Sequence, residues 1–371
     1  MVNGDSTAVN ADSAAENKLT FNGYLKDLQT LTFTGGFKQA VSSSLLHHRL
    51  NVKWKPLGTL TAAAEFRNRF FWGEEVKAVP GYADLLRNKN ELVDLSKAWI
   101  DKEVVLHTNT ERLWAEYHRE RWNLRAGRQR INWGITTLWN PNDLFNTYNF
   151  LDFDYEERPG SDAVKGQYFF KDGRNVEAAV AFQGRGRSVG AVKYFVNTGG
   201  YDLQAIGGWY RESWVIGGGW AGSIGEAGFK GEAMYFMPGD SGGHFNGVVE
   251  GDYVLDNGWY GNVGGLFNSG GLNRPAEDWR ALHFDLSSRN LMPVKWAVAL
   301  TAGKEFTPLF SGSLTTVYAP GTNMLILFPS LKYSLVTNLD VDLVWQSFFA
   351  QTNRLFEDQG HGVFLRIRWS Y

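Results

Sequence analysis

A two-residue alternation of apolar and polar side chains runs through most of this chain of 371 residues. In the stretch LLHHRLNVKWK, the apolar residues Leu46, Leu50 and Trp54 fall on one face of an extended strand. Arg49 and Lys53 fall on the opposite face, because successive side chains of a strand point to opposite sides. A chain in which nearly every segment has this period is predicted to be all-β, with one apolar and one polar face on each strand.

Turn-forming residues divide the alternating segments into eighteen predicted strands. An even number of strands brings both termini to the same end of a closed antiparallel barrel. We expect residues 1–17 to form a disordered tail at the start of the mature chain, and residues 18–371 to form a single barrel. The longer connections, expected mostly at the end away from the termini, are 73–103, 132–162, 270–292 and 350–361. The predicted strands are 19–33, 43–55, 59–72, 104–118, 122–131, 163–171, 175–183, 187–197, 201–211, 213–223, 227–237, 245–256, 258–269, 293–305, 309–319, 323–335, 339–349 and 362–371.

The composition favours a membrane barrel over other fold classes. The 42 Gly, 25 Phe, 15 Trp and 15 Tyr are typical of closed β-barrels, and no apolar run reaches the roughly 20 residues of a membrane-spanning helix. The net charge of −2 gives no reason to expect nucleic acid, and the absence of Cys excludes disulfides. We find no strand that is apolar on both faces, as a soluble sandwich core requires, and no propeller-length repeat. The prediction is a transmembrane barrel in a bacterial outer membrane, with short periplasmic turns and long extracellular loops.

Two neighbouring stretches carry a resemblance to known barrels. The segment WNLRAGRQRINWG, residues 122–134, resembles the strand-and-loop signature of outer-membrane porins of the alginate-export type. The segment WNPNDLFNTYNFLDFDYEERPGSDAVK, residues 139–165, is similar to part of little-characterised barrels of Bacteroidetes type. The resemblance implies an outer-membrane location and passive passage of a solute.

The chain ends in VFLRIRWSY, in which Leu365, Ile367 and Trp369 alternate with Arg366 and Arg368. We expect this strand to close the barrel by pairing with the first strand, with its arginines toward the lumen and its apolar side chains toward lipid. The aromatic terminus is similar to the signal that the barrel-assembly machinery recognises, although Tyr stands where Phe is usual.

Cations on the polar faces of the strands beside this closure form a predicted basic arc of the lumen. Carboxylates such as Glu177, Glu232, Glu250 and Asp252 are expected on the opposite wall. One interpretation is that the arc guides small polar or anionic solutes, such as acidic saccharides, because rings of Arg and Lys favour anions. The other is that these cations only hydrate the lumen and pair with nearby carboxylates such as Glu65. The predicted arc consists of Lys26, Arg49, Lys53, Arg67, Arg69, Arg112, Arg125, Arg128, Arg130, Arg366 and Arg368.

The sequence GRQRIN conflicts with a regular strand. Arg128 and Arg130 fall on the same face as the apolar Trp122 and Leu124, which would aim two cations at lipid. We therefore predict a bulge at Gly127 that reverses the register, or a strand that has already left the bilayer at this point.

The connection 132–162 is the main candidate for a functional loop, because ordered loops of this length usually have a function. Folded inward, it would constrict the pore and set its selectivity. The alternative is an extracellular lid whose carboxylates pair with Arg128, Arg130 and Arg158. The oxygen-rich DFDYEE could also hold Ca²⁺, although its spacing matches no defined calcium loop. The residues expected at this site are Asp152, Asp154, Glu156, Glu157 and Arg158.

No hydrolase motif surrounds any of the seven His, so we expect no catalytic residue, metal or cofactor apart from bound lipid or detergent. The predicted function is an outer-membrane channel. The alternative is a barrel plugged by its loops that anchors or scaffolds a surface or lipoprotein partner, and an outer-membrane hydrolase is a third hypothesis. The expected partners are outer-membrane lipids, the barrel-assembly machinery and a small polar or anionic solute, and not nucleic acid.

Overall fold

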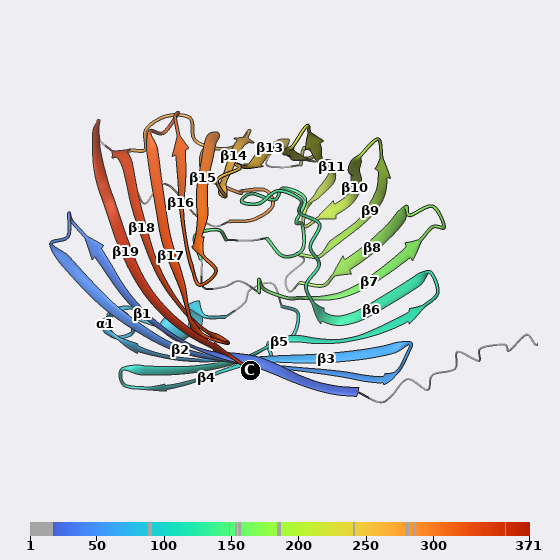
Figure 1. The fold of residues 1–371 in the computed structure, drawn as a ribbon, viewed down its shortest axis with the longest axis horizontal. Coiled ribbons are helices and arrows are strands. Elements are labelled where there is room, and N and C mark those ends of the chain that lie inside the picture. Colours follow the sequence, from blue (N-terminus) through green and yellow to red (C-terminus); the bar gives the residue numbers. More distant parts are fainter. Residues whose placement is uncertain are drawn as a thin grey trace, which may run out of the picture.

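A computed structural model describes residues 18–371 except 88–90, 148, 153, 155, 156, 184–186, 240, 241, 279–281, 283, 285 and 353. Its described residues form one antiparallel sheet in which β1 pairs with both β2 and β19, so the sheet closes on itself (Figure 1). Of the nineteen strands in these residues, β4 pairs with β5 alone, which leaves eighteen in the closed wall. The predicted closed antiparallel barrel is confirmed.

Short turns connect most neighbouring strands of the wall. The strands are β1 (Lys18–Thr34), β2 (Gln39–Leu57), β3 (Leu60–Gly73), β5 (Val104–Arg119), β6 (Trp122–Gln129), β7 (Ser161–Phe169), β8 (Asn175–Ala181), β9 (Val189–Thr198), β10 (Tyr201–Tyr210), β11 (Ser213–Ile224), β12 (Ala227–Phe236), β13 (His244–Val254), β14 (Trp259–Asn268), β15 (Trp296–Thr307), β16 (Phe310–Ala319), β17 (Met324–Val336), β18 (Leu339–Thr352) and β19 (Leu355–Ser370). The connection between β3 and β5 adds α1 (Glu74–Ala78), α2 (Tyr82–Leu85) and β4 (Ser96–Asp101).

Each of the eighteen predicted strands corresponds to a strand of the wall, but two connections differ from expectation. The connection 73–103 contains α1, α2 and β4, which were not predicted. The long connection expected at 350–361 is wrong, because β18 continues to Thr352 and β19 begins at Leu355. The polar residues there resemble a loop in sequence, because this hairpin extends beyond the apolar part of the wall and no longer alternates.

The two ends of the barrel differ in the length of their connections. Both described ends of the chain, Lys18 and Tyr371, lie at one end, which we call the terminal end, and all its connections are short turns. The opposite end, which we call the loop end, has the three longest connections, 74–103, 130–160 and 269–295. This asymmetry is the one that outer-membrane barrels have between their periplasmic and extracellular sides.

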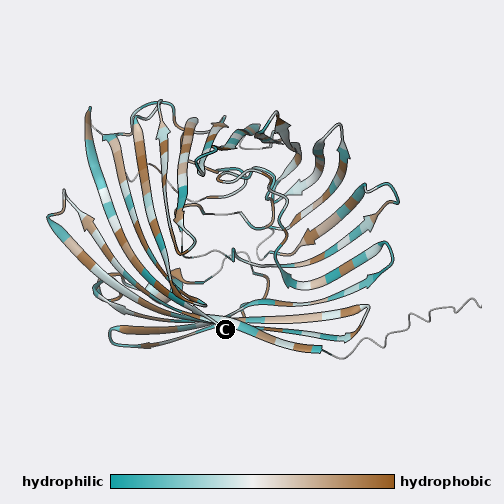
Figure 2. Ribbon diagram, in the orientation of Figure 1, coloured by the Kyte–Doolittle hydropathy of each residue, from teal (hydrophilic) through white to brown (hydrophobic). Residues whose placement is uncertain are grey.

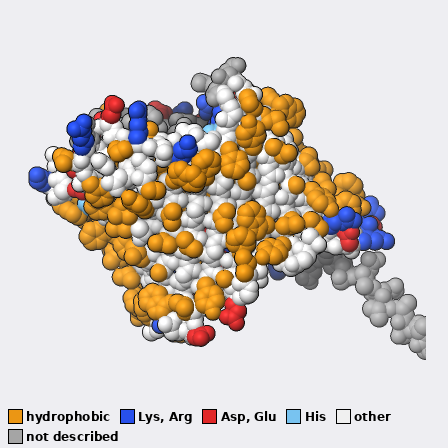
Figure 3. All heavy atoms as spheres, turned by 90° about the horizontal axis from the view of Figure 1, so that it is seen from above, with side chains coloured by type: hydrophobic (Ala, Val, Ile, Leu, Met, Phe, Trp, Pro, Cys, Tyr) orange, Lys and Arg blue, Asp and Glu red, His pale blue; other side chains and the backbone are white. Residues whose placement is uncertain are grey.

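The outer face of the barrel is largely apolar. Side chains along each strand alternate in hydropathy (Figure 2), and hydrophobic side chains cover much of the visible outer face while charged groups gather near its edges (Figure 3). In β19, Leu365, Ile367 and Trp369 are exposed on this face, whereas Arg366 is buried on the inner side. Lys26 of β1 pairs with Arg368 in the ladder that closes the barrel. Among the described residues, no helix is long and apolar enough to cross a membrane.

One part of the barrel interior is apolar, contrary to the expectation that no strand is apolar on both faces. The inward faces of β13 to β18 pack near the loop end against Trp139 and Phe150 of the connection 130–160 and against Leu291 and Met292 of the connection 269–295. The two connections thus supply an internal core, which explains why these strands need a second apolar face. The buried side chains contributed by the strands are Val248, Leu266, Ala297, Ala299, Val317, Ala319, Met324, Ile326 and Ala350.

Candidate functional site

The connection between β6 and β7, residues 130–160, lies inside the barrel, and we call it the inward loop (Figure 1). Its Trp133 and Phe145 are almost completely buried and pack with inward-facing residues such as Ala181, Val189 and Met234. Burying a large aromatic side chain stabilises the fold by several kcal/mol, because the free energy falls by about 25 cal/mol for each Å² of apolar surface removed from water. The sequence folds inward here because its aromatic side chains complete a core that the strands alone leave open.

The first half of the inward loop is held by one buried carboxylate on the wall opposite the barrel closure. Glu232 of β12 accepts hydrogen bonds from the backbone N–H groups of Thr136 at 2.6 Å and Asn142 at 3.0 Å, and also from that of Ile135. The Thr136 hydroxyl donates a further bond at 3.0 Å, and Asn140 donates one at 3.3 Å. The carboxylate is 1% exposed, so these donors replace the water that its charge requires.

Two further carboxylates of the inner face, on β13 and β8, extend this contact. Glu250 of β13 accepts a bond from the backbone N–H of Thr137 at 2.7 Å and another from the Thr137 hydroxyl. The indole N–H of Trp133 donates to Glu177 of β8. We call Glu177, Glu232 and Glu250 the acidic wall; it holds the first half of the loop through four backbone N–H groups and four side-chain donors.

The side chains of the second half of the inward loop contact the strands beside the barrel closure, chiefly β1, β2 and β19, which we call the basic strands. Asp154 forms an ion pair with Lys26 of β1 at 2.8 Å and lies 3.4 Å from Arg366 of β19 and 3.7 Å from His47 of β2. Burial alone would raise the pKa of Asp154, but the nearby His47 and the hydrogen bond and charge of Lys26 outweigh it, so the pKa lies below its ordinary range. Asp154 is therefore an ionised carboxylate that joins the two strands of the barrel closure.

Glu157 and the backbone beside it make a second set of contacts with the basic strands. The hydroxyl of Tyr24 donates to Glu157 at 2.7 Å, and Arg49 lies 4.0 Å from the same carboxylate. Burial would raise the pKa of Glu157, but Arg49 and the Tyr24 hydroxyl lower it below its usual value. Arg112 donates to the carbonyl groups of Glu157 at 2.9 Å and Arg158 at 2.7 Å. The inward loop therefore bridges two walls of opposite charge.

A third ion pair lies within the inward loop itself. Asp143 is completely buried and lies 3.3 Å from Arg158, one of the residues predicted for this site from the sequence. Burial raises the pKa of Asp143 to about 7, and the charges of Arg158 and Arg130 oppose this rise only in part. The carbonyl of Asp143 also accepts a bond from the Ser288 hydroxyl at 2.6 Å, which joins the inward loop to the connection 269–295.

Most other cations of the predicted basic arc are paired on the inner wall. Arg49 contacts Glu65, Arg67 lies 3.5 Å from Glu111, and Arg125 donates to Glu116 at 2.7 Å. Arg69 contacts the ring of His107 at 3.1 Å, Arg366 donates to Asp342 at 3.0 Å, and Arg368 lies over the Tyr24 ring at 4.5 Å. Lys53 is exposed near the terminal end and has no side-chain partner among the described residues. The arrangement fits the pairing interpretation of the arc for most of its members.

Arg128, predicted as a lumen cation, is a buried residue held by two ion pairs. It is 2% exposed and forms ion pairs with Asp162 of β7 at 2.8 Å and Glu91 at 3.1 Å. It also donates to the carbonyl of Thr110 at 2.9 Å. This carbonyl lies where the partner of β5 changes, because β4 pairs with β5 up to Asn109 whereas β6 pairs with it from Leu113 onward. Arg128 thus joins the wall at this fork.

The bulge predicted at Gly127 is absent. The ladders of β6 with β5 and β7 run through Gly127 without a shift of register. Gly127 instead has φ of +113°, and a Cβ there would lie 2.2 Å from the carbonyl oxygen of Leu113. The irregularity in register lies on the neighbouring strand β5, next to Glu111, where Glu65 pairs with Arg112 and Phe66 with Thr110.

The Ca²⁺ site considered for DFDYEE has little support in the part of the chain that the structure describes. Glu156 lies outside the described residues, and Asp152 is exposed. Asp154 and Glu157 contact Lys26 and Tyr24. Within the described residues, no cluster of three His or acidic side chains could hold a metal ion.

Several site residues were missed by the sequence analysis. The backbone donors from Ile135 to Asn142 carry no signal in the sequence, because every non-proline residue has an N–H group. Tyr24 and His47 occupy inward positions and could have been found by extending the lumen face of β1 and β2 to uncharged polar side chains. Asp143 was not considered, although it lies in the same connection as the residues chosen.

No family model and no curated protein matches this sequence. Solved structures match over nearly the whole chain. OccAB4 from Acinetobacter baumannii has a TM-score of 0.61 at 10% identity, covering 98% of this chain and 100% of that chain. The outer membrane protein OpdK from Pseudomonas aeruginosa has a TM-score of 0.58 at 11% identity, covering 95% and 98%. A structure of OpdK with vanillate gives 0.58 at 10% identity and covers 95% and 98%.

This chain has the fold of these outer-membrane proteins. The identities are so low that the likeness establishes the fold alone. The solute therefore has to be inferred from the site.

Proposed function

We propose that this protein is a channel of the bacterial outer membrane for small polar or anionic solutes, with the inward loop as its constriction. The observation that carries the proposal is the bridging of the lumen by this loop, between Glu232 on one wall and Lys26 and Arg366 on the other. A solute on this path would pass charged groups of both signs at the narrowest point. Rings of charged side chains set selectivity in such pores.

The location in the outer membrane is inferred from the apolar outer face of the closed barrel and from the short turns of the terminal end. A preference for anions is inferred from the number of cations along β1, β2, β3 and β19, and OpdK with vanillate is a structural neighbour that holds a small organic anion. Acidic saccharides are one candidate class of solute, because residues 122–165 resemble barrels of the alginate-export type.

The second candidate is a plugged barrel that serves as an anchor or scaffold. It is favoured by the apolar core inside the loop end, where Trp139 and Phe150 pack against Met292 and the strands. A core of this kind resists displacement more than a hydrated loop does, because its removal would expose apolar surface to water.

Single-channel recording in a planar bilayer under a salt gradient tests the two functions. A steady current whose reversal potential shows anion preference, and loses part of it in the variant Arg366→Ser, supports the channel. A correctly folded barrel that never conducts would contradict the channel and leave the scaffold, for which pull-down of a surface or lipoprotein partner is the next experiment.

A further inference from the structure

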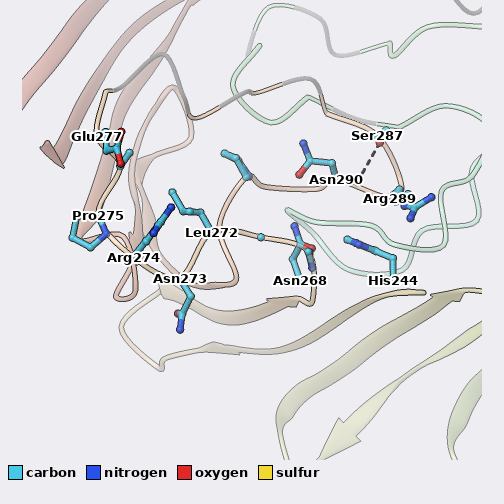
Figure 4. Close-up of a pocket in the computed structure, with 14 residues that line it drawn as sticks. His244, Asn268, Leu272, Asn273, Arg274, Pro275, Glu277, Ser287, Arg289 and Asn290 are labelled. Atoms are coloured by element: carbon cyan, nitrogen blue, oxygen red, sulfur yellow. Dashed lines mark hydrogen bonds between the residues drawn. The ribbon is translucent and has the colours of Figure 1, made fainter. Parts of the chain in front are cut away.

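A cavity opens at the loop end, beside the inward loop. It has a volume of about 1030 Å³ and is lined by described residues of the connection 269–295, which we call the capping loop, together with His244 of β13 and Asn268 of β14 (Figure 4). A volume of this size suits a small organic molecule. The cavity is separate from the ion pairs of the constriction, because none of the residues that line it belongs to the inward loop.

Two arginines give this cavity its character. Arg274 and Arg289 both line it and lie toward opposite ends, with Asn268 and Asn290 between them (Figure 4). Among the described residues, no carboxylate lies within ion-pair distance of either guanidinium group, and Arg289 donates one bond to the carbonyl of Gly242 at 3.2 Å. Arg49, Arg125 and Arg366 on the inner wall, in contrast, each contact a carboxylate, so these two guanidinium groups retain donors for an anion.

The walls of the cavity are already fixed by hydrogen bonds. Asn268 donates to the carbonyl of Met292 at 2.7 Å, and the backbone of Leu272 is bonded in both directions to the segment 293–295 at 3.0 and 2.8 Å. On the other side, Asn246 of β13 donates to the carbonyl groups of Ser288 at 2.8 Å and Arg289 at 3.0 Å. A site whose walls are fixed before binding loses less conformational entropy on association.

We propose that this cavity binds an elongated organic anion with a carboxylate at each end, before the anion enters the lumen. One carboxylate would pair with Arg289 and the other with Arg274, since a guanidinium group binds a carboxylate through two parallel donors. The middle of the molecule would lie along Leu272 and the amide side chains. This inference deepens the proposed channel function, on which its biological sense rests, but the binding itself does not depend on conduction.

One carboxylate that lines the cavity is expected to weaken the binding of an anion. Glu277 lies at the Arg274 end of the cavity, is exposed, and forms no ion pair with Arg274 in the described structure (Figure 4). Its charge repels an anion that approaches this end, so its removal should strengthen binding. This expectation has the opposite sign to that for the two arginines and gives the proposal an internal check.

Isothermal titration calorimetry on the purified full-length protein in detergent tests the proposal. The probes are succinate, adipate, suberate and sebacate, with hexanoate as the monocarboxylate of similar size. We expect saturable binding of a longer dicarboxylate and much weaker binding of hexanoate. Arg274→Gln and Arg289→Gln should each raise the dissociation constant about tenfold, as expected for loss of one charged hydrogen-bonded contact.

The control variant is Arg354→Gln, which changes an exposed arginine in a turn of the loop end that does not line the cavity. It should leave binding unchanged, whereas Glu277→Gln should tighten it. Equal binding of hexanoate and the dicarboxylates, no binding of any of them, or no effect of the two arginine variants would overturn the site. A silent bilayer with intact binding would instead overturn only the channel, so the two failures are distinguishable.

Discussion

The two halves of the inward loop are held in different ways. The first half, around residues 133–142, gives backbone N–H groups to buried carboxylates of the acidic wall, chiefly to Glu232. In the second half, the carboxylates of Asp154 and Glu157 bind cations and a hydroxyl group of the basic strands. The loop therefore donates hydrogen bonds to the acidic wall and accepts hydrogen bonds from the basic strands. Its position across the lumen is set by the opposite charge of the two walls, and Glu232 on β12 lies about half-way round the barrel from β1 and β19.

This difference separates contacts that tolerate substitution in the loop from those that do not. On the acidic wall, a loop residue can change its side chain and keep its N–H bond, so the wall residue is the sensitive partner. On the basic strands, the ion pairs depend on loop carboxylates, and Lys26 and Arg366 share Asp154. Lys26 and Arg112 also donate to loop carbonyl groups, which do not depend on a side chain. Loss of one buried carboxylate should therefore have a larger effect on the acidic wall than on the basic strands.

The largest effect is expected from Glu232→Gln. The amide has one acceptor oxygen where the carboxylate has two, so its NH₂ group would face either the N–H of Asn142 or those of Ile135 and Thr136. Loss of a buried, multiply bonded charge costs roughly 2 to 4 kcal/mol. We expect the first half of the loop to leave the wall, and single-channel conductance to rise several-fold.

The matched control for this variant is Glu305→Gln, which changes an exposed glutamate near the terminal end. Its conductance should equal that of the unchanged protein. Equal conductance of the Glu232 variant and the control, with both barrels folded by circular dichroism, would show that the acidic wall does not hold the loop.

A smaller effect is expected from Asp154→Asn. The side chain would keep one acceptor oxygen for Lys26, while Glu157 would still accept from Tyr24 and lie near Arg49. The change leaves Lys26 and Arg366 with one carboxylate fewer, so it should increase anion preference more than conductance. The measurement is the reversal potential under a salt gradient, with Asp256→Asn in an exposed turn as the control. A shift toward cations would contradict the role given to Asp154.

The sequence predicted the fold far better than the site. The alternation of side chains fixes which face of each strand is buried, and a slip of one residue would reverse every side chain, so eighteen strands and the closure by β19 could be predicted. The same rule failed at Arg128, because its surroundings are set by the fork between β4 and β6, which depends on a long-range pairing. Glu232 was correctly expected on the far wall, but its partners are backbone groups that no sequence pattern identifies.

The pH dependence of the current tests the ion pair inside the loop. Burial raises the pKa of Asp143 to about 7 in the docked loop, whereas a released loop exposes this carboxylate, whose pKa then lies near the ordinary value of about 3.9. The docked state thus binds the proton more tightly. Its extra stability is fully present below the pKa of the exposed group and is lost as the pH rises through about 7.

We therefore expect the conductance to rise moderately when the pH increases from about 6 to about 8, as Asp143 loses its proton and docking weakens. Asp143→Asn cannot ionise and should remove this rise, while the hydrogen bond from Ser288 to the backbone carbonyl at position 143 is kept. Arg158 and Arg130 are the cations that face the carboxylate, and Glu232 is the acid whose charge acts on it. The same rise in the variant would assign it to another group.

The smallest effect is expected from Thr137→Val, which tests the claim that the acidic wall is held by backbone donors. The variant loses the hydroxyl bond to Glu250 but keeps the backbone N–H bond to the same carboxylate, which is 2.7 Å long. Loss of one partly exposed hydroxyl bond costs about 1 kcal/mol, and Lys230 and Asn262 still bind Glu250 at 3.4 and 2.9 Å. Conductance should therefore stay close to that of the unchanged protein. A change as large as that of Glu232→Gln would mean that side chains, and not backbone groups, hold this half of the loop.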